Sequence, residues 1–350
     1  MIEEKIQIAS DEELGSLGVA HLKRFWSRYV ANRSAAAPPD GGVNEWAADN
    51  TVLSGLGLNL HETLHYLYSA APTFEQFEQW IRERNGGAID PTRIQRINAA
   101  FRRSGSGASE DSAAPADLPL GPQDLALSPE DLAFWRENGY VVVHNAATPE
   151  GCAAAVEAIC EFLRMDLNEP NTWYNGPQGH SIWVPLLRHP AIEANRNSPR
   201  VRPAFEQIWG RSDLWMTVDQ CGMNPPERPG WQFPGPHMHW DTSLELPIPF
   251  GVQGLLYLTD TAAEQGAFTC VPGFHLKIED WLKSLPEGIN PREQNLAALG
   301  EVPIAGQAGD LIIWHQALPH GSRPNRTTRP RFVQYMAMRP SDFETNPNWR

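Results

Sequence analysis

The stretch GDLIIWHQALPHGSRPNRTTRPRF, residues 309–332, runs from an apolar segment through a histidine to a group of arginines. Its apolar segment, LIIWH, is short, β-branched and bounded by glycine and proline, which predicts a buried strand. Further short runs of this kind occupy the carboxy-terminal half: LWMTVDQCG (214–222), GVQGLLYLTDT (251–261), GAFTCVPG (266–273) and RFVQYMAM (331–338). Closely spaced strands with glycine and proline between them predict an all-β barrel or sandwich at the centre of this half.

Helices are predicted on the amino-terminal side of these strands. SPEDLAFWRENG (128–139) begins with Ser-Pro and ends in glycine, as a capped helix does, and the β-branched run YVVVHN (140–145) follows it as a strand. Two more helices are predicted, over TPEGCAAAVEAICEFLRM (148–165) and SPRVRPAFEQIWG (198–210). We therefore expect residues 128–350 to form an α+β domain with a mainly β core and flanking helices.

Residues 1–102 are expected to form a separate, small helical domain. In DEELGSLGVAHLKRFWSRYV (11–30), several side chains recur at helical spacing: Leu14, Leu17, His21, Leu22 and Phe25. Thr73 and Gln76 form a capping-box pattern at the start of another helix. Residues 103–127 are rich in Ser, Ala, Gly and Pro, can bury little apolar surface, and are predicted to be a linker.

The overall composition excludes some functions. The formal net charge of -14 argues against non-specific binding to nucleic acid or to an anionic membrane. We find no apolar run of membrane-spanning length and no secretory signal in MIEEKIQIASDEELG. The four cysteines include no CxxC pair, which favours a reduced protein with buried thiols and a cytoplasmic location.

One candidate metal motif is His61-Glu62-Thr63-Leu64-His65, which matches the zinc-peptidase pattern H-E-x-x-H. Two histidines four residues apart share a helix face and can bind one zinc ion, but a third ligand is required. Tyr68 and Ala71 occupy the glycine and third-histidine positions of the extended motif. Three downstream glutamates are available: Glu75, Glu78 and Glu83. An amphipathic helix with incidental polar residues is the favoured interpretation, and a zinc metallopeptidase is an alternative.

A second candidate lies in PGPHMHWDTS, residues 234–243. His239 and Asp241 share a face of an extended segment, because strand side chains alternate with a period of two. His320, near the end of a later strand, can supply a third ligand. Two histidines and one carboxylate on one face of an octahedron suit non-haem Fe(II). His-x-Asp alone is weak evidence for a metal site, and the surrounding sequence decides whether the prediction holds.

Those surroundings resemble the phytanoyl-CoA dioxygenase family of Fe(II)/2-oxoglutarate-dependent oxygenases. The resemblance covers roughly residues 128–340 and rests on His239-Trp240-Asp241 and on three longer segments: ENGYVVVHNAATPEGC (137–152), LYLTDTAAEQGAFTCVPGFH (256–275) and residues 309–332. Phe274 is a departure, since the family often has serine there. The resemblance implies a double-stranded β-helix, the cupin-like jelly-roll fold.

The resemblance also implies roles for individual residues. His239, Asp241 and His320 would be the iron ligands, and Arg331 would pair with the far carboxylate of 2-oxoglutarate, to which Ser322 would also bind. A two-pronged guanidinium–carboxylate pair explains arginine rather than lysine at that position. Arg329 is left open as a competitor. The implied cofactors are Fe(II), 2-oxoglutarate as co-substrate and O2, with succinate and CO2 as co-products.

The substrate is expected to be a small molecule, with carboxylated and carrier-linked substrates both left open. The predicted substrate-pocket residues are Trp173, Tyr174, His180 and Trp240, and for Trp240 packing against the barrel is the alternative. Four arginines lie close together in the sequence: Arg323, Arg326, Arg329 and Arg331. They form either a solvated loop or a positive rim that attracts a carboxylate. Because Asp241 is a full carboxylate ligand that leaves no place for a halide, hydroxylation is favoured over halogenation, with desaturation and cyclisation open. A non-catalytic jelly-roll binding protein is a further alternative.

Overall fold

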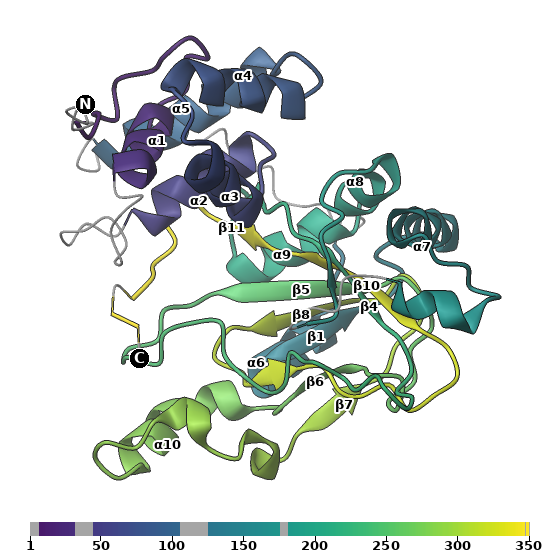
Figure 1. Ribbon diagram of the computed structural model, residues 1–350. Coiled ribbons are helices and arrows are strands. Elements are labelled where there is room, and N and C mark those ends of the chain that lie inside the picture. Colours follow the sequence, from purple (N-terminus) through teal and green to yellow (C-terminus); the bar gives the residue numbers. More distant parts are fainter. Residues whose placement is uncertain (1–6, 32–44, 106–124, 176–180, 347, 350) are drawn as a thin grey trace. The chain divides into compact units, whose positions relative to one another are not determined.

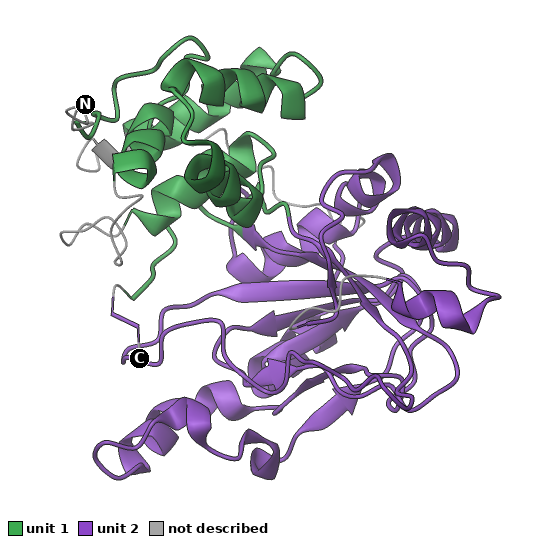
Figure 2. Cartoon of the chain, viewed as in Figure 1, with its two compact units in different colours: residues 1–117, 213–218, 339–347 green, residues 118–212, 219–338, 348–350 purple. Residues whose placement is uncertain are grey.

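The computed structural model describes residues 7–31, 45–105, 125–175, 181–346, 348 and 349 (Figure 1). The chain divides into two compact units (Figure 2). Unit 1 comprises residues 1–117, 213–218 and 339–347, and unit 2 comprises residues 118–212, 219–338 and 348–350. Within the described residues, none of the helices is both long enough and apolar enough to cross a membrane.

The described elements are mostly short. The α-helices are α1 (Leu22–Ala31), α2 (Trp46–Gly55), α3 (Leu60–Ala70), α4 (Phe74–Arg84), α5 (Pro91–Gly105), α6 (Pro129–Asn138), α7 (Pro149–Leu163), α8 (Pro190–Arg196), α9 (Val201–Trp209) and α10 (Ile278–Ser284). Short 3-10 turns cover Pro170–Tyr174, Phe274–Leu276, Pro291–Glu293 and Leu296–Leu299. The strands are β1 (Tyr140–Val143), β2 (Trp183–Val184), β3 (Trp215–Met216), β4 (Cys221–Asn224), β5 (Val252–Tyr257), β6 (Phe268–Cys270), β7 (Val302–Ile304), β8 (Leu311–His315), β9 (His320–Gly321), β10 (Arg331–Met336) and β11 (Met338–Arg339).

Unit 2 is built on two antiparallel sheets, one with the strand order β1-β8-β5-β10-β4-β2 and one with the order β7-β6-β9. One apolar cluster takes residues from both sheets, including Leu255, Trp314 and Val333 from the larger and Phe268 and Cys270 from the smaller. Two antiparallel sheets that face one core form the jelly roll expected from the sequence. Helices α7, α8 and α9 lie on the other side of the larger sheet (Figure 1).

The period of two along each strand explains this layering. On β10 the side chains of Arg331, Val333 and Tyr335 share the face that meets the core. The alternate residue Gln334 is on the opposite face, where it meets Asn195 of α8 at 3.3 Å. On β5, likewise, Gln253 shares a face with Leu255 and Tyr257. One face of the sheet therefore lines the interior of the jelly roll, and the other is covered by helices.

The predicted helix caps on the amino-terminal side of the strands are confirmed. Ser128 and Asp131 form a reciprocal capping box at the start of α6, and Thr148 caps α7. Gly139 ends α6 with φ 73°, and a Cβ at this position would lie 2.5 Å from the His275 ring. Glycine is required there because its conformation is left-handed and its neighbour leaves no space for a side chain. Strand β1 can then begin at the next residue.

Unit 1 is helical, as expected, but its first helix is shorter than predicted. The structure starts α1 at Leu22, and residues 11–21 form turns. Gly15 and Gly18 have φ values of 64° and 69°, which a right-handed helix does not allow. The predicted helical face from Leu14 to Phe25 is therefore wrong before residue 22, and Leu14 is 40% exposed. The capping box of Thr73 and Gln76 at α4 is confirmed.

The division into units differs from the predicted boundaries at two segments. Residues 213–218 and 339–347, which the sequence assigned to the second domain, belong to unit 1. Trp215 is part of the apolar core of unit 1, and the guanidinium of Arg96 lies 3.9 Å from the centre of its ring. The predicted linker, residues 103–127, falls largely outside the described residues. All four cysteines are described, and each is a free thiol.

Candidate metal centre

His239 and His320 are brought together by backbone pairing. The N–H of His239 donates to the carbonyl of His320 at 2.8 Å, and the N–H of His320 donates back at 2.9 Å. His320 lies on β9, where it pairs with Cys270 of β6. The segment that carries His239 and Asp241 thus extends the three-stranded sheet beyond β9. Residues about eighty positions apart in the chain become direct neighbours.

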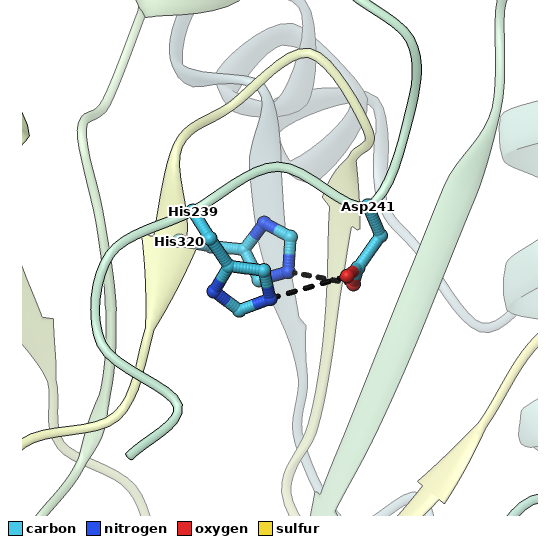
Figure 3. A group of neighbouring side chains, drawn as sticks. All are labelled: His239, Asp241 and His320. Atoms are coloured by element: carbon cyan, nitrogen blue, oxygen red, sulfur yellow. Dashed lines mark hydrogen bonds and ion pairs between the residues drawn. The ribbon is translucent and has the colours of Figure 1, made fainter. Parts of the chain in front are cut away.

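The three side chains converge on one point (Figure 3). Asp241 Oδ1 lies 3.2 Å from His239 Nε2, and Asp241 Oδ2 lies 3.2 Å from His320 Nε2. One ligand atom from each residue lies within 4.8 Å of the others. His320 is 4% exposed, whereas the side chain of Asp241 is 48% exposed. The cluster therefore has one buried wall and one side that solvent reaches.

Hydrogen bonds determine which nitrogen each histidine presents. His239 Nδ1 lies 2.6 Å from the carbonyl of His237, and His320 Nδ1 lies 3.1 Å from the carbonyl of Leu318. A carbonyl can only accept, so each Nδ1 carries the hydrogen. In the neutral ring Nε2 then keeps its lone pair, and it is Nε2 that faces the cluster in both residues. A metal ion requires this arrangement, with the other ring nitrogen held by an acceptor.

The electrostatics of the cluster favour an ionised Asp241. Partial burial by itself raises the pKa of this carboxyl, but the hydrogen bonds and charges of His239 and His320 outweigh it and hold the pKa well below its usual range. Burial lowers the pKa of His239, while the hydrogen bond and charge of Asp241 raise it further than burial lowers it. Two nitrogens and a carboxylate are thus a donor set suited to a divalent cation.

Arg331 lies on the inward face of β10 and is 0% exposed. Its Nη1 donates to Ser322 Oγ at 3.2 Å. Its Nε and Nη2 atoms have no hydrogen-bond partner among the described residues. A buried guanidinium with two unpaired donors is costly in free energy unless an anion binds there. Arg329 precedes the strand and is exposed.

Tyr335 lies two inward positions beyond Arg331 on the same strand. Burial raises the pKa of its hydroxyl, and the charge of Arg331 opposes this. The charge of Asp241 also reaches the hydroxyl and raises its pKa. The charges of Arg331 and Asp241 thus both act on this one hydroxyl.

The expected substrate-pocket residues are scattered. Trp240 is 2% exposed, packs against Phe274 and Trp281, and donates its indole N–H to the carbonyl of Ala317 at 3.0 Å. It therefore supports the core, because its ring and its donor are both already engaged. Trp173 is also buried and donates to the carbonyl of Asp166. His180 lies outside the described residues.

Tyr174 has a different environment. Its hydroxyl donates to the carbonyl of Pro226 at 2.7 Å, and the guanidinium of Arg228 lies 3.4 Å from the centre of its ring. Trp231 packs against the ring with an edge contact. Tyr174 is thus held in a local surface cluster, where its role toward a substrate stays a prediction.

The zinc-peptidase pentapeptide lies on α3, as predicted, but its histidines do not assemble a site. His61 and His65 are exposed, and Glu62 pairs with Arg84 at 3.0 Å. Among the described residues, the groups able to hold an ion are the 239/241/320 cluster and a second cluster of His21, Glu45 and Asp49. His61 and His65 belong to neither. The motif is a coincidence of polar side chains on an amphipathic helix.

The second cluster already has internal counter-ions. Arg28 Nη1 lies 2.8 Å from Glu45 and 3.0 Å from Asp49, and Arg24 pairs with Glu45 at 2.7 Å. The arginine charges neutralise the carboxylates that a cation would need. This cluster is therefore a buried ion-pair network of unit 1.

Sequence reasoning missed Gln253, which touches the candidate metal cluster directly. Its Nε2 donates to Asp241 Oδ2 at 2.8 Å, and its Oε1 accepts from the indole N–H of Trp314 at 3.1 Å. A signal was present in the sequence, because the period of two places Gln253 on the same face as Leu255 and Tyr257. A polar residue on the apolar face of a buried strand indicates a partner inside the core.

Comparisons with known proteins find a matching family and several relatives. Residues 135–333 match the family described as Phytanoyl-CoA dioxygenase (PhyH). A Dictyostelium discoideum protein that carries the phytanoyl-CoA dioxygenase name is 22% identical over 260 residues, which cover 59% of this chain and 74% of the relative. Ectoine dioxygenase of Bordetella bronchiseptica is 21% identical over 239 residues, or 61% of this chain and 75% of the relative. The solved structure of EctD from S. alaskensis with bound Fe is 18% identical, with a TM-score of 0.47, and covers 65% of this chain and 81% of its own.

Proposed function

The chain belongs to the phytanoyl-CoA dioxygenase family, and on that premise we propose that His239, Asp241 and His320 hold its iron. Arg331 and Ser322 hold the 2-oxoglutarate co-substrate in the same proposal. The protein is a non-haem iron oxygenase that uses Fe(II), 2-oxoglutarate and O2 to act on a small molecule. The assignment of these roles to individual residues is what the geometry supports.

The observation that carries the proposal is the convergence of two Nε2 atoms and one ionised carboxylate. Both Nδ1 atoms donate to backbone carbonyls, so the rings are held with Nε2 facing Asp241. This set fits Fe(II), which accepts imidazole and carboxylate ligands on one face and leaves other positions open.

A second observation supports the co-substrate site. Arg331 is fully buried with two unpaired donors, Nε and Nη2, and its third donor group already meets Ser322. The far carboxylate of 2-oxoglutarate can accept from both unpaired atoms at once, as a two-pronged pair. Arg329 is exposed and outside β10, which favours Arg331 for this role.

The chain's own contribution is binding, orientation and exclusion of water. The chemistry supplied by bound Fe(II) is oxidative decarboxylation of 2-oxoglutarate coupled to oxidation of the substrate, with succinate and CO2 as co-products. Trp314 and Phe268 pack against the His320 ring at centroid distances of 5.1 and 6.2 Å and keep it buried. Asp241 is half exposed, and the open side it faces is where a substrate can approach.

Hydroxylation is the reaction that the ligand set favours. Asp241 supplies a carboxylate where a halogenating site needs room for a halide ion. Desaturation and cyclisation use the same ligand set and stay open. These outcomes differ in the position of the substrate relative to the ion.

The nature of the substrate beyond a small molecule is also a prediction. Of the clustered arginines, Arg323 pairs with Glu301 at 2.9 Å and Arg331 is buried, whereas Arg326 and Arg329 are exposed. A carboxylated or carrier-linked substrate would meet a weaker positive rim than the sequence suggested. The cytoplasmic location stays a prediction that rests on the free thiols.

The proposal can be tested without knowing the substrate. With Fe(II) and air, we expect the wild-type protein to release succinate slowly from 2-oxoglutarate in an uncoupled reaction. Asp241→Ala and His239→Ala should abolish this release, and His61→Ala should leave it unchanged. If wild-type protein shows neither succinate release nor Fe(II)-dependent binding of 2-oxoglutarate, the proposed function is wrong.

A further inference from the structure

Gln253 contacts the candidate iron ligand Asp241 but is not itself a candidate ligand, because its nitrogen belongs to an amide. It lies on the inward face of β5 and pairs across the sheet with Trp314 of β8. Its Nε2 donates to Asp241 Oδ2 at 2.8 Å, the shortest of the contacts to this carboxylate from His239, His320 and Gln253. When an ion binds, the two histidines bind it through Nε2 and give up their contacts with Asp241. The contact between the Gln253 amide and Asp241 can remain.

The chemistry of Trp314 fixes which end of the Gln253 amide faces Asp241. An indole N–H can only donate, so the group that it meets at 3.1 Å must be the amide oxygen, Oε1. The NH2 end is then directed at the carboxylate. This orientation follows from donor and acceptor types alone, although amide ends are otherwise hard to distinguish. Trp314 is 3% exposed, so its own position is fixed by the core.

Trp314 also reaches the second histidine of the cluster. Its ring lies 5.1 Å from the ring of His320 and 4.5 Å from that of Phe268. One buried indole therefore braces His320 by packing and Asp241 through the Gln253 amide. Two of the three candidate ligands depend on it.

We propose that Gln253, oriented by Trp314, is a positioning residue that keeps Asp241 Oδ2 engaged and leaves Oδ1 for the metal ion. This inference rests on the proposed function. Six positions surround an octahedral ion, and two histidines with one carboxylate oxygen fill three of them. The remaining three suffice for 2-oxoglutarate, which chelates through two oxygens, and for O2. If Asp241 bound through both oxygens, one of those positions would be lost.

A glutamine suits this role better than a cation. Lysine or arginine would hold Oδ2 as well, but a positive charge there would oppose binding of a divalent ion through the same carboxylate. A neutral amide restrains the oxygen and leaves the charge of Asp241 for the metal. Outer partners of this kind typically change metal affinity or activity by about 10–100-fold when they are removed.

The test compares Gln253→Met, which keeps the length and loses the donor, with Gln253→Glu, which places an acceptor beside Asp241. Trp314→Phe removes the indole N–H that orients the amide, together with part of the ring that packs against His320. Gln316→Met is the matched control, because Gln316 is also partly buried and donates to a backbone carbonyl, that of Pro249, away from the cluster. The readouts are Mn(II) affinity by calorimetry and the visible charge-transfer absorption that 2-oxoglutarate gives with Fe(II) under anaerobic conditions.

We expect Gln253→Met and Trp314→Phe to weaken 2-oxoglutarate binding to the Fe(II) protein about tenfold or more and to alter the absorption band, with thermal stability of the metal-free protein measured in parallel. Gln253→Glu should show the largest loss of 2-oxoglutarate affinity, and Gln316→Met should show no loss. If Gln253→Met binds 2-oxoglutarate with wild-type affinity and shows an unchanged absorption band, the proposed positioning role of Gln253 is wrong. Absence of the band in the wild type would instead overturn the proposed function, and this inference with it.

Discussion

Arg331 provides a test in which folding stability and ligand binding are expected to change in opposite directions. The guanidinium is 0% exposed, and among the described residues it hydrogen-bonds to Ser322 through Nη1, while Nε and Nη2 are unpaired. Arg331→Met keeps an unbranched side chain of similar reach and removes the charge. Both unpaired donors then disappear from the interior, together with the contact to Ser322.

The magnitudes favour the variant when no ligand is present. Each unpaired buried donor costs about 1–3 kcal/mol, whereas one hydrogen bond from a charged group contributes about 1.5–3 kcal/mol. The variant removes two unpaired donors, each of which destabilises the fold, and one stabilising hydrogen bond. It should therefore be as stable as the wild type or more stable. With 2-oxoglutarate at about 100 times its Kd, the wild type gains about 2.7 kcal/mol. At about 2–4 °C per kcal/mol this corresponds to an increase in Tm of about 5–11 °C, which Arg331→Met should lack.

The assay is thermal unfolding of the protein loaded with Mn(II), which prevents turnover, with and without 2-oxoglutarate. Arg331→Lys keeps the charge but loses the two-pronged geometry, so we expect it to retain only part of the ligand-induced shift. Arg329→Met is the matched control, since Arg329 is exposed, and it should show the full shift.

Two results would refute this reasoning about Arg331. The first is a full 2-oxoglutarate shift in Arg331→Met. The second is a loss of more than about 3 kcal/mol in the ligand-free variant, because a loss of that size is typical of a buried charge whose partners are already in place. Either result would move the co-substrate site elsewhere in the interior.

Three further predictions concern other parts of the chain. His320→Gln should weaken Mn(II) binding at least about tenfold by calorimetry, while His61→Ala with His65→Ala should leave it unchanged; equal effects would contradict the cluster. Trp240→Phe should lower the free energy of unfolding by about 1–3 kcal/mol in urea, because the carbonyl of Ala317 loses its donor, with 2-oxoglutarate affinity preserved. Burial lowers the pKa of His21, but Asp11 and Asp49 outweigh it and raise the pKa above 6.5. The ion pairs of protonated His21 therefore stabilise unit 1 fully below pH 6.5, in a network with Glu45, Arg24 and Arg28. This stabilisation should be lost as the pH rises through the raised pKa of His21. Thermal unfolding between pH 6 and 9 checks this, and a wild-type profile identical to that of His21→Gln would contradict it.

The strands and caps of unit 2 could be predicted because they depend on local patterns. Glycine, proline and alternating apolar residues mark each short strand, and Ser128 and Gly139 mark the two ends of α6. The His-x-Asp pair could be predicted for the same reason, since a spacing of two already places both side chains on one face. His320 needed the family resemblance, because no local pattern connects it to a segment about eighty residues earlier.

Elements that depend on distant partners were predicted less well. Residues 11–21 have the spacing of a helix, but Gly15 and Gly18 adopt left-handed conformations that only the folded chain shows. Residues 213–218 have the composition of one more jelly-roll strand, yet Trp215 packs into the helical core of unit 1. Local propensity cannot decide which of two cores receives a tryptophan.

Trp240 and Gln253 show why the neighbours of the candidate metal cluster are harder to assign than its candidate ligands. Trp240 stands between two candidate ligands, which suggested a pocket, but alternation turns it away from them and into the core. Gln253 looked like an ordinary strand residue, and its contact with Asp241 depends on the register that pairs it with Trp314. Because register sets which side chains meet across a sheet, a supporting residue is found from sequence only when its polarity conflicts with its face. Gln253 is such a conflict, and the same criterion points to Arg331, a charged residue on the inward face of β10.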